Sequence, residues 1–453
     1  MWRTFLIAMS LAGPASPASS TTGAPTDAVF PYPIDQKELA NGLRLVGVHF
    51  DSPGLLSYYT IVRVGSRHEV EPGRSGFAHF FEHMMFRGTE KYDEEEYNDV
   101  LASMGADSNA NTSFDRTRYH ILASSSALPK IVDIESDRFQ NLKYSEEQFQ
   151  KEAGAVLGEY NANASDPVQA LQVEMYQTAL QVHPYRHLVI GFLEDIQTMP
   201  TMYDYSLEFF DRFYRPEYTT ILVVGDFDWE ELTRLVEEAY GQWKRGSYAG
   251  KIPTEPPQTE PKEVKLEWPA PTLPYLMIAY RAPAFNTESA EMPTLDVLSQ
   301  LAFGETSALH RELVIEKQWV DFIGAGAFDQ ADPTLFTILT RVRQPEKLGE
   351  VRDAILAQVD RLHTERFDPE RLAATKSHMK YQFLMGMDTA DAVANTLSHF
   401  LALTGDPQTV NRVYQLYDAV TPETLNRVAR QYLRSEARTM VTLQPAASVK
   451  GEE

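Results

Sequence analysis

Two histidines and a glutamate in residues 76–88 have the types and the spacing of a metal site. His79, Glu82 and His83 form an H-x-x-E-H sequence. On a helix, residues i and i+4 lie one above the other, so both imidazoles can aim at one point, and Glu82 shares that face. Imidazole and carboxylate groups are ligands of Zn²⁺, which favours a tetrahedral site. The sequence therefore predicts a zinc helix, the inverted form of the H-E-x-x-H helix.

The alternative is an amphipathic helix that carries two ordinary histidines. The residues around the motif are almost all apolar: Phe77, Phe80, Phe81, Met84, Met85 and Phe86. Unpaired charge on a buried helix is costly, and three titratable groups on one face need a partner. A metal ion is such a partner, so the metal interpretation is preferred.

A catalytic zinc needs a third protein ligand and one open position. Ser145 and Gln148 have the spacing of a capping box, which predicts that a helix begins here. Its apolar stripe consists of Phe149, Ala153, Val156, Leu157 and Tyr160. Glu152 and Glu159 are two helical turns apart and fall on or beside this stripe, so both are candidates. The alternative is that they are charges at the edge of a solvated helix.

The chain resembles the pitrilysin (M16) family of zinc peptidases, which includes the mitochondrial processing peptidases and insulin-degrading enzyme. The resemblance rests on the H-x-x-E-H motif and on Glu159 with Glu152 seven residues before it. Residues 105–119 are similar to the family's G-x-x-x-N-A-x-T-x-x-D-x-T-x-Y stretch, and His183-Pro-Tyr and residues 213–226 also match. The similarity covers nearly the whole mature chain and is most specific in residues 60–226.

The resemblance implies an α+β fold with two homologous α/β-sandwich domains that form a clam-like chamber, with zinc on the first. One Zn²⁺ per chain would be held by His79, His83 and Glu159. Glu82 would act as the general base toward the attacking water and then pass the proton to the leaving amine. Glu152 would support this chemistry from behind by steadying a ligand.

The same resemblance places Asn109 and Ala110 on an edge strand to which a substrate peptide adds as a further strand. Backbone pairing of this kind gives affinity without strict sequence choice. The expected substrates are therefore peptides.

The second half departs from the family pattern. Members that act alone usually carry an Arg and a Tyr in a stretch like L-R-E-x-x-G-L-A-Y. Here the Arg position falls on Val314 or Ile315, and the Tyr position on Asp321 or Phe322. The chain is thus expected to be the catalytic subunit of a heterodimer whose homologous partner supplies both groups, although a homodimer is also considered. The alternatives within the chain are Arg311, Arg341 and Arg343.

Composition limits the class of protein. The 453 residues are 43% hydrophobic and 23% charged, which is typical of globular proteins. A chain this long exceeds one core and predicts at least two domains. The net charge of −23 disfavours nucleic acid as a partner. The chain has no cysteine, which excludes disulfides, thiol catalysis and a Cys-rich zinc site.

The expected order along the chain begins with a signal peptide at 1–18 and a flexible lead-in at 19–30. Arg3, a short apolar run and small residues near Ala18 favour export, to the bacterial periplasm, over a mitochondrial transit peptide. No later run is long enough to span a bilayer, so no stable membrane insertion is expected. The zinc-bearing domain is expected at 31–245, a Pro-rich linker at 246–274 and the homologous metal-free domain at 275–448.

The sequence is compatible with three functions: a zinc endopeptidase or oligopeptidase, a non-catalytic scaffold subunit, and a zinc- or peptide-binding protein without turnover. Glu82 favours the first, because binding alone does not need a carboxylate beside the metal. His183 and His187 are also four residues apart, but Pro184 indicates a loop rather than a helix there, so a second metal site is disfavoured.

Overall fold

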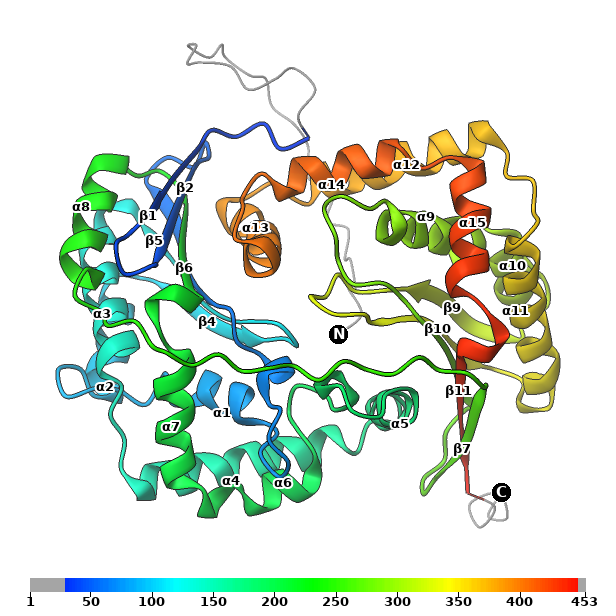
Figure 1. Ribbon diagram of the computed structural model, residues 1–453, viewed down its shortest axis with the longest axis horizontal. Coiled ribbons are helices and arrows are strands. Elements are labelled where there is room, and N and C mark those ends of the chain that lie inside the picture. The colour runs from blue at the N-terminus through cyan, green and yellow to red at the C-terminus, as the bar shows by residue number, and fades with distance from the viewer. Residues whose placement is uncertain (1–28, 447–453) are drawn as a thin grey trace.

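The computed structural model describes residues 29–446, which form two β-sheets with helices around them (Figure 1). The first sheet has the strand order β1-β2-β6-β3-β5-β4. Its strands are β1 (Ile34–Glu38), β2 (Arg44–His49), β3 (Leu55–Val62), β4 (Asp107–Thr112), β5 (Thr117–Ser124) and β6 (Thr219–Gly225). The second sheet has the order β7-β11-β8-β10-β9. Its strands are β7 (Lys262–Trp268), β8 (Tyr275–Arg281), β9 (Val320–Gly326), β10 (Leu335–Val342) and β11 (Arg438–Pro445).

The two sheets have the same topology. In the first, β2 and β6 are parallel, and β6-β3, β3-β5 and β5-β4 are antiparallel. In the second, β7 and β11 are parallel, and β11-β8, β8-β10 and β10-β9 are antiparallel. Strand β1 is the addition that the first sheet carries at its edge. The predicted α+β fold with two related domains is therefore confirmed, and β4 of the first domain corresponds to β9 of the second.

Helices cover both sheets. Those that precede residue 241 are α1 (Phe77–Met84), α2 (Glu94–Ser103), α3 (Leu128–Asn141), α4 (Glu146–Asn163), α5 (Pro167–Ala179), α6 (Leu193–Thr198), α7 (Tyr203–Phe213) and α8 (Trp229–Tyr240). Those that follow are α9 (Glu291–Phe303), α10 (Ala308–His310) with a π-helix at Arg311–Glu316, α11 (Leu348–Leu362), α12 (Pro369–Met385), α13 (Ala390–Thr404), α14 (Thr409–Asp418) and α15 (Pro422–Tyr432).

One helix from each domain packs on the sheet of the other domain. Helix α13 packs on β3 and β6, where its Val393 and Leu397 share a buried apolar cluster with Tyr59 and Leu222. Helix α5 packs on the second sheet against β7, β8 and β11. Both helices lie between the two sheets (Figure 1). Burial of apolar surface is the main stabilising term in folding, so this exchange couples the two domains.

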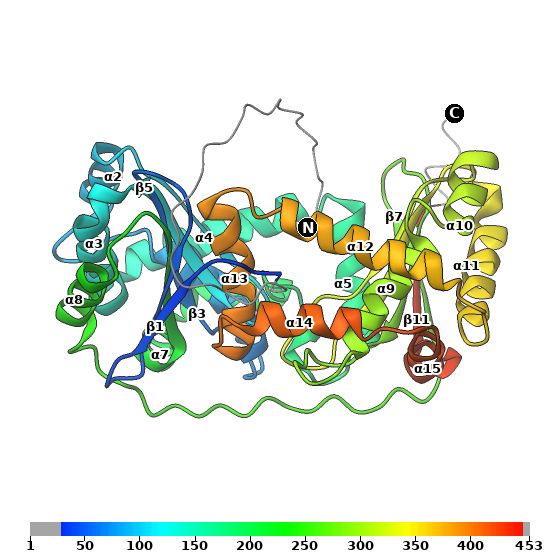
Figure 2. The same ribbon diagram turned by 90° about the horizontal axis from the view of Figure 1, so that it is seen from above.

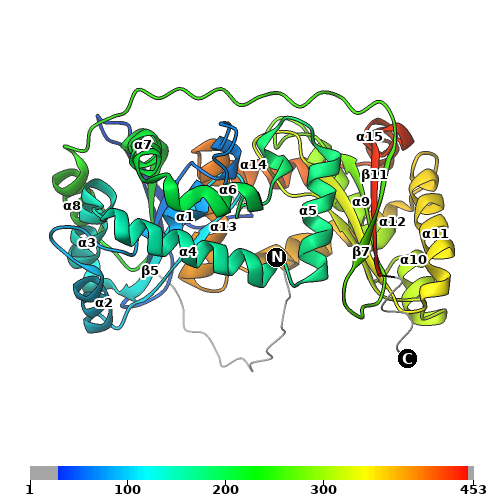
Figure 3. The same cartoon turned by 90° about the horizontal axis from the view of Figure 1, so that it is seen from below.

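The structure differs from the prediction that residues 246–274 form a linker. Residues 241–261 cross from one domain to the other as an extended chain, as Figures 2 and 3 show from opposite sides. Residues 262–268, however, form strand β7 at the edge of the second sheet. The second domain thus begins before residue 275. Seven prolines precede or follow this strand and favour a linker, although its polar and apolar residues alternate. Its partner β11 also lies far away along the chain.

The predicted signal peptide, most of the lead-in, and residues 447–448 of the second domain lie outside the described residues. Within residues 29–446, no helix combines the length and apolarity needed to cross a membrane.

Candidate metal centre

Helix α1 carries the H-x-x-E-H motif and is fixed at its start. Gly76 precedes the helix with a φ of 92°, a left-handed conformation that suits glycine. A side chain there would also collide with Ile196, because its Cβ would lie 2.4 Å from the Ile196 Cδ1 atom. The buried Glu69 carboxylate accepts hydrogen bonds from the backbone N–H groups of Gly76 (2.8 Å) and Ala78 (2.7 Å). Glu69 thus satisfies donors at the helix N-terminus.

Apolar packing orients the same helix. Phe80 and Phe81 face the core, where Phe80 contacts Phe149 of α4 edge-on and Phe81 stacks on Phe209 of α7. The opposite face of the helix is left for His79, Glu82 and His83. The alternation of apolar and titratable residues in the sequence therefore decides which way the imidazoles point.

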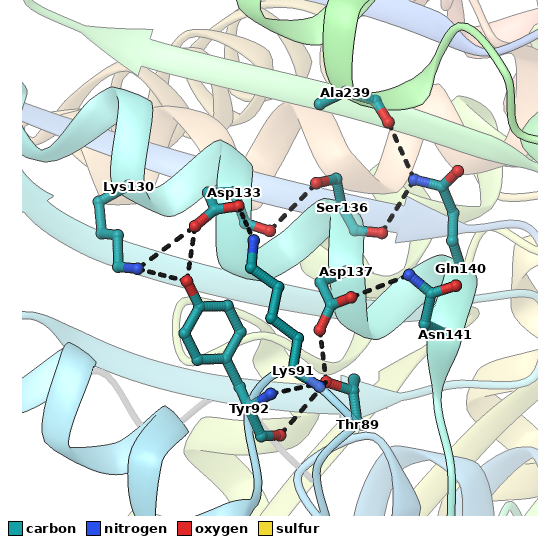
Figure 4. Close-up of polar contacts among 10 residues, drawn as sticks. All are labelled: Thr89, Lys91, Tyr92, Lys130, Asp133, Ser136, Asp137, Gln140, Asn141 and Ala239. Carbon is teal, nitrogen blue, oxygen red and sulfur yellow. Dashed lines mark hydrogen bonds and ion pairs between the residues drawn. The ribbon is translucent and has the colours of Figure 1, made fainter.

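The segment after α1 is held against helix α3 by a polar network (Figure 4). The Tyr92 hydroxyl donates to Asp133 over 2.6 Å, and Lys130 forms an ion pair with the same carboxylate at 3.3 Å. Thr89 donates to Asp137 on the next turn of α3. Both ends of the motif helix are therefore anchored by contacts outside the site.

Helix α4 supplies the two predicted carboxylates. It begins at the expected capping box, in which the Ser145 side chain accepts from the Gln148 N–H and the Gln148 side chain accepts from the Ser145 N–H. Glu152 is 4% exposed and Glu159 is 41% exposed. The helix crosses α1 so that both carboxylates reach the imidazoles.

His79, His83 and Glu159 converge on one point. The Glu159 Oε2 atom lies 3.6 Å from Nε2 of His79 and 3.4 Å from Nε2 of His83, and one ligand atom from each residue falls within 4.8 Å of the others. Two atoms that bind zinc at about 2.0–2.2 Å in tetrahedral geometry lie about 3.3–3.5 Å apart. The two histidines and the carboxylate therefore suit Zn²⁺ in both donor type and separation. Residues 29–446 offer no other group of three His, Asp or Glu side chains arranged in this way.

Glu152 lies behind the candidate metal ligands and orients one of them, His83. The Nδ1–H group of His83 donates to Glu152 over 2.8 Å, which leaves Nε2 of His83 facing Glu159. The other carboxylate oxygen of Glu152 forms an ion pair with Nε of Arg87 at 2.7 Å. A carboxylate that fixes the tautomer of a histidine ligand is a common feature of zinc sites.

The two imidazoles differ in protonation. Burial lowers the pKa of His79, which favours the neutral form that binds metals. The hydrogen bonds to Glu152 and Glu159 raise the pKa of His83 to about 9 in the absence of metal. His83 would therefore have to release this proton to serve as a metal ligand.

Glu82 points at strand β4. Its Oε2 atom accepts a hydrogen bond from the Thr112 hydroxyl over 2.6 Å. Thr112 is the last residue of β4, so the candidate base is tied to the predicted peptide-binding strand. Thr112, Arg87 and Glu69 were missed as supporting residues. For Arg87, the four-residue spacing from His83 was an available signal; for Glu69, no local pattern indicated its capping role.

Asn109 and Ala110 lie on β4, which is an edge strand of the first sheet. Ala110 pairs with Tyr119 of β5, and no described strand pairs with the other side of β4. The Ala110 N–H group donates to the Asn109 side chain over 2.8 Å. The strand therefore has an unpaired edge beside α1. One backbone donor on this edge, the Ala110 N–H group, is hydrogen-bonded to the Asn109 side chain, which can rotate away.

The residues at the expected Arg and Tyr positions lie on or just before β9, the counterpart of β4. They are Val314, Ile315, Asp321 and Phe322. Ile315 is 62% exposed and Phe322 is 37% exposed. Asp321 forms ion pairs with Nε of Arg341 (2.5 Å) and Nε of Arg343 (2.8 Å). Two of the three arginines considered as substitutes within the chain are thus engaged by a carboxylate.

His183 and His187 do not form a second centre with other ligands. His183 caps a short 3₁₀ helix, and its Nε2 atom lies 3.0 Å from a carboxylate oxygen of Asp332 in the second domain. The Nδ1–H group of His187 donates to the carbonyl of Leu188. Burial lowers the pKa of His187 to about 4, so this histidine is neutral.

Comparison with protein families agrees with this arrangement. A family model described as "Insulinase (Peptidase family M16)" matches residues 57–191, and one described as "Peptidase M16 inactive domain" matches residues 202–379. The first match contains α1, β4 and α4, and the second contains β9. The chain belongs to the peptidase M16 family.

Individual relatives extend over most of the chain. The zinc protease PqqE of Helicobacter pylori is 28% identical over 422 residues, which cover 90% of this chain and 92% of the relative. The β subunit of the mouse mitochondrial-processing peptidase is 24% identical over 418 residues, covering 90% and 83%. A crystal structure of a protease from Helicobacter pylori superposes with a TM-score of 0.85 at 27% identity and covers 91% of this chain and all of its own. The first of these relatives is named a zinc protease and the second a subunit of a processing peptidase, and the family to which this chain belongs is described as a peptidase family.

Proposed function

We propose that this protein is a zinc-dependent endopeptidase or oligopeptidase whose metal ligands are His79, His83 and Glu159. The observation that carries the proposal is the convergence of these three side chains at separations that suit tetrahedral zinc. Relatives named zinc proteases support it. When bound, zinc would lower the pKa of a coordinated water to about 7 and polarise the peptide carbonyl.

Glu82 acts as the general base in this proposal. Its carboxylate is beside both histidines on α1 and is oriented by the Thr112 hydroxyl. It removes a proton from the attacking water and returns it to the amine that leaves. A positioned acid–base group typically contributes about 10²–10⁴ in rate.

The peptide binds along the free edge of β4, near Asn109 and Ala110. Rotation of the Asn109 carboxamide frees the Ala110 N–H group for a substrate carbonyl. Added strands gain main-chain hydrogen bonds that are independent of side-chain identity. This mode suits a peptidase that accepts varied sequences.

A homologous partner supplies the missing Arg and Tyr. Ile315 and Phe322 have no polar group, and Asp321 would repel negative charge that develops on the carbonyl oxygen. One relative is itself named as a subunit, which supports a heterodimer. Residues 1–18 have the pattern of an export signal, and a related fold is described as a periplasmic protease, so we propose a periplasmic location.

The proposal is tested by measuring zinc content and peptide hydrolysis of the purified chain, with Glu159→Gln as the variant. Gln lacks the anionic oxygen, so the variant is expected to retain well under half of the zinc of wild type. The exposed Glu147→Gln on the same helix is the matched control. Undiminished zinc in Glu159→Gln would show that a different carboxylate binds the metal.

The same assay separates turnover from binding. Hydrolysis that a chelator abolishes and zinc restores is expected, with a larger rate when a homologous partner that carries Arg and Tyr is co-expressed. A zinc-loaded chain that binds peptides but cleaves none, with or without such a partner, would favour the binding protein over the enzyme.

A further inference from the structure

A pocket of about 450 Å³ lies at the start of the interdomain chain, and none of its residues belongs to the metal centre. Its wall is formed by the beginning of β2, the residue after β3, the turn before β6 and the chain that leaves the first domain. It is lined by Glu38, Gly42, Arg44, Arg63, Glu217, Tyr218, Arg245, Gly246, Ser247 and Tyr248. Three arginines and two glutamates give the pocket a net positive charge in a strongly acidic protein.

Two of the arginines carry buried donors that no group in residues 29–446 satisfies. The Arg63 Nε atom and the Arg44 Nη1 atom are buried without a hydrogen-bond partner. Among residues 29–446 no ion pair includes Arg63, whose Nη2 atom donates only to the carbonyl of Glu217. Burial and the neighbouring charge of Arg44 lower the pKa of Arg63. Adjacent guanidinium groups with unmet donors favour a bound anion.

Glu217 adds an unmet acceptor to the same pocket. Its Oε1 atom accepts from the Gly246 N–H group over 2.8 Å, whereas its Oε2 atom is buried and has no partner among the described residues. A simple anion would be repelled by this oxygen. A ligand that carries several acceptor oxygens and one hydroxyl group would satisfy both the arginines and Glu217.

We propose that this pocket binds inorganic phosphate, with Arg63 donating to its oxygens, Arg44 adding positive charge beside it, and Glu217 accepting from its P–OH group. Planar guanidinium groups match phosphate oxygens through paired hydrogen bonds. Phosphate keeps at least one proton at neutral pH, whereas sulfate keeps none, so the pocket discriminates between these two anions of similar shape. Arg245 at the exposed rim contributes a third positive charge.

The location gives this site a link to both domains. The Arg44 Nη1 atom packs against Gly405, the residue that follows α13, so closely that a Cβ on Gly405 would lie 1.6 Å from it. Gly246 belongs to the chain that connects the domains. A bound phosphate therefore contacts the first domain and the connecting chain directly, and reaches the second domain through Arg44.

The test is calorimetric titration of the full chain with phosphate and with sulfate, at constant ionic strength in chloride and near pH 7.5. Wild type is expected to bind phosphate at least ten-fold more tightly than sulfate. Arg63→Gln is expected to weaken phosphate binding about ten-fold or more, since a hydrogen bond to a charged group is lost. Arg245→Gln, at an exposed position, should weaken it several-fold without affecting folding.

Two controls keep the result specific. Arg234→Gln removes an exposed arginine of α8 that pairs with Glu238 outside the pocket, and should leave phosphate affinity unchanged. Glu217→Gln should abolish the preference for phosphate over sulfate. Zinc content is measured in every preparation, because phosphate also binds metals. Equal phosphate affinity in wild type, Arg63→Gln and Arg245→Gln at equal zinc content, or no phosphate binding by wild type, would overturn the proposal.

Discussion

Glu152 shows how a single residue can connect the metal site to the fold. It contacts His83 with one oxygen and Arg87 with the other. Burial would raise its pKa, but the hydrogen bonds from His83 and Arg87 outweigh this effect, so the pKa of Glu152 is lowered and the carboxylate is ionised. An ionised acceptor holds the His83 ring with Nε2 toward Glu159, which is the orientation that a metal requires.

Replacing Glu152 with Gln is expected to weaken zinc binding about 10- to 100-fold, the usual effect of losing such a supporting contact. Titration of the metal-free protein with zinc and a competing chelator measures this change. The exposed Glu147→Gln again serves as the control, and the unfolding midpoint of each metal-free variant is recorded. If Glu152→Gln loses stability but keeps its zinc affinity, Glu152 is only a structural partner of Arg87.

At the scale of elements, the candidate metal centre depends on two helices and one edge strand. The sequence indicated both helices, because the motif spacing and the Ser145 capping box are local signals. The contact of Glu82 with Thr112 was not predictable, since it joins α1 to a strand that follows only after another helix. Strand β7 was missed for a related reason: its hydrogen-bond partner β11 is distant in the chain, and prolines surround it.

The edge-strand mode of substrate binding predicts a selective effect of Ala110→Pro. Proline removes the N–H group that faces the Asn109 side chain rather than β5, and edge strands tolerate proline. The KM for peptides is expected to rise about ten-fold with unchanged zinc content. Steady-state kinetics on a fluorogenic peptide measures this change.

Asp107→Ala, at the exposed start of the same strand, is the control for general disturbance of β4. Equal effects of the two substitutions on KM, or no effect of Ala110→Pro, would argue against backbone pairing at this edge.

At the scale of the whole molecule, each sheet is covered on one face by a helix from the other domain. Polar contacts join the domains as well. The loop after β9 reaches the first domain, where Asp332 forms ion pairs with Arg67 and His183. Arg67 and His183 hold the pKa of Asp332 well below its usual range against the opposing effect of burial. The chamber expected between the domains stays a prediction.

Asp296 on α9 is expected to make stability depend on pH. Burial, and then the charge of Asp329, raise the pKa of Asp296 to about 8, and the Tyr417 hydroxyl donates to its carboxyl group. The folded protein therefore binds a proton that the unfolded chain has released above about pH 4. This group's contribution to stability is greatest at low pH and is lost between about pH 4 and 8.

Asp296→Asn removes this titration. The free energy of unfolding of the variant, measured with denaturant from pH 4.5 to 8, should rise relative to that of wild type by up to about 1.4 kcal/mol per pH unit. Asp353→Asn, an exposed change on α11, is the control. A difference between variant and wild type that does not change with pH would contradict a raised pKa at Asp296.

The most direct test of the central claim is a side-by-side measurement of zinc content and peptide hydrolysis in wild type and Glu82→Gln. The substitution leaves His79, His83 and Glu159 intact and keeps a hydrogen-bond acceptor for Thr112, so one zinc per chain should remain bound. Hydrolysis, assayed together with a homologous partner, should fall by about 10²–10⁴ because the general base is lost. A Glu82→Gln variant that retains zinc and cleaves peptides at nearly the wild-type rate would contradict the account.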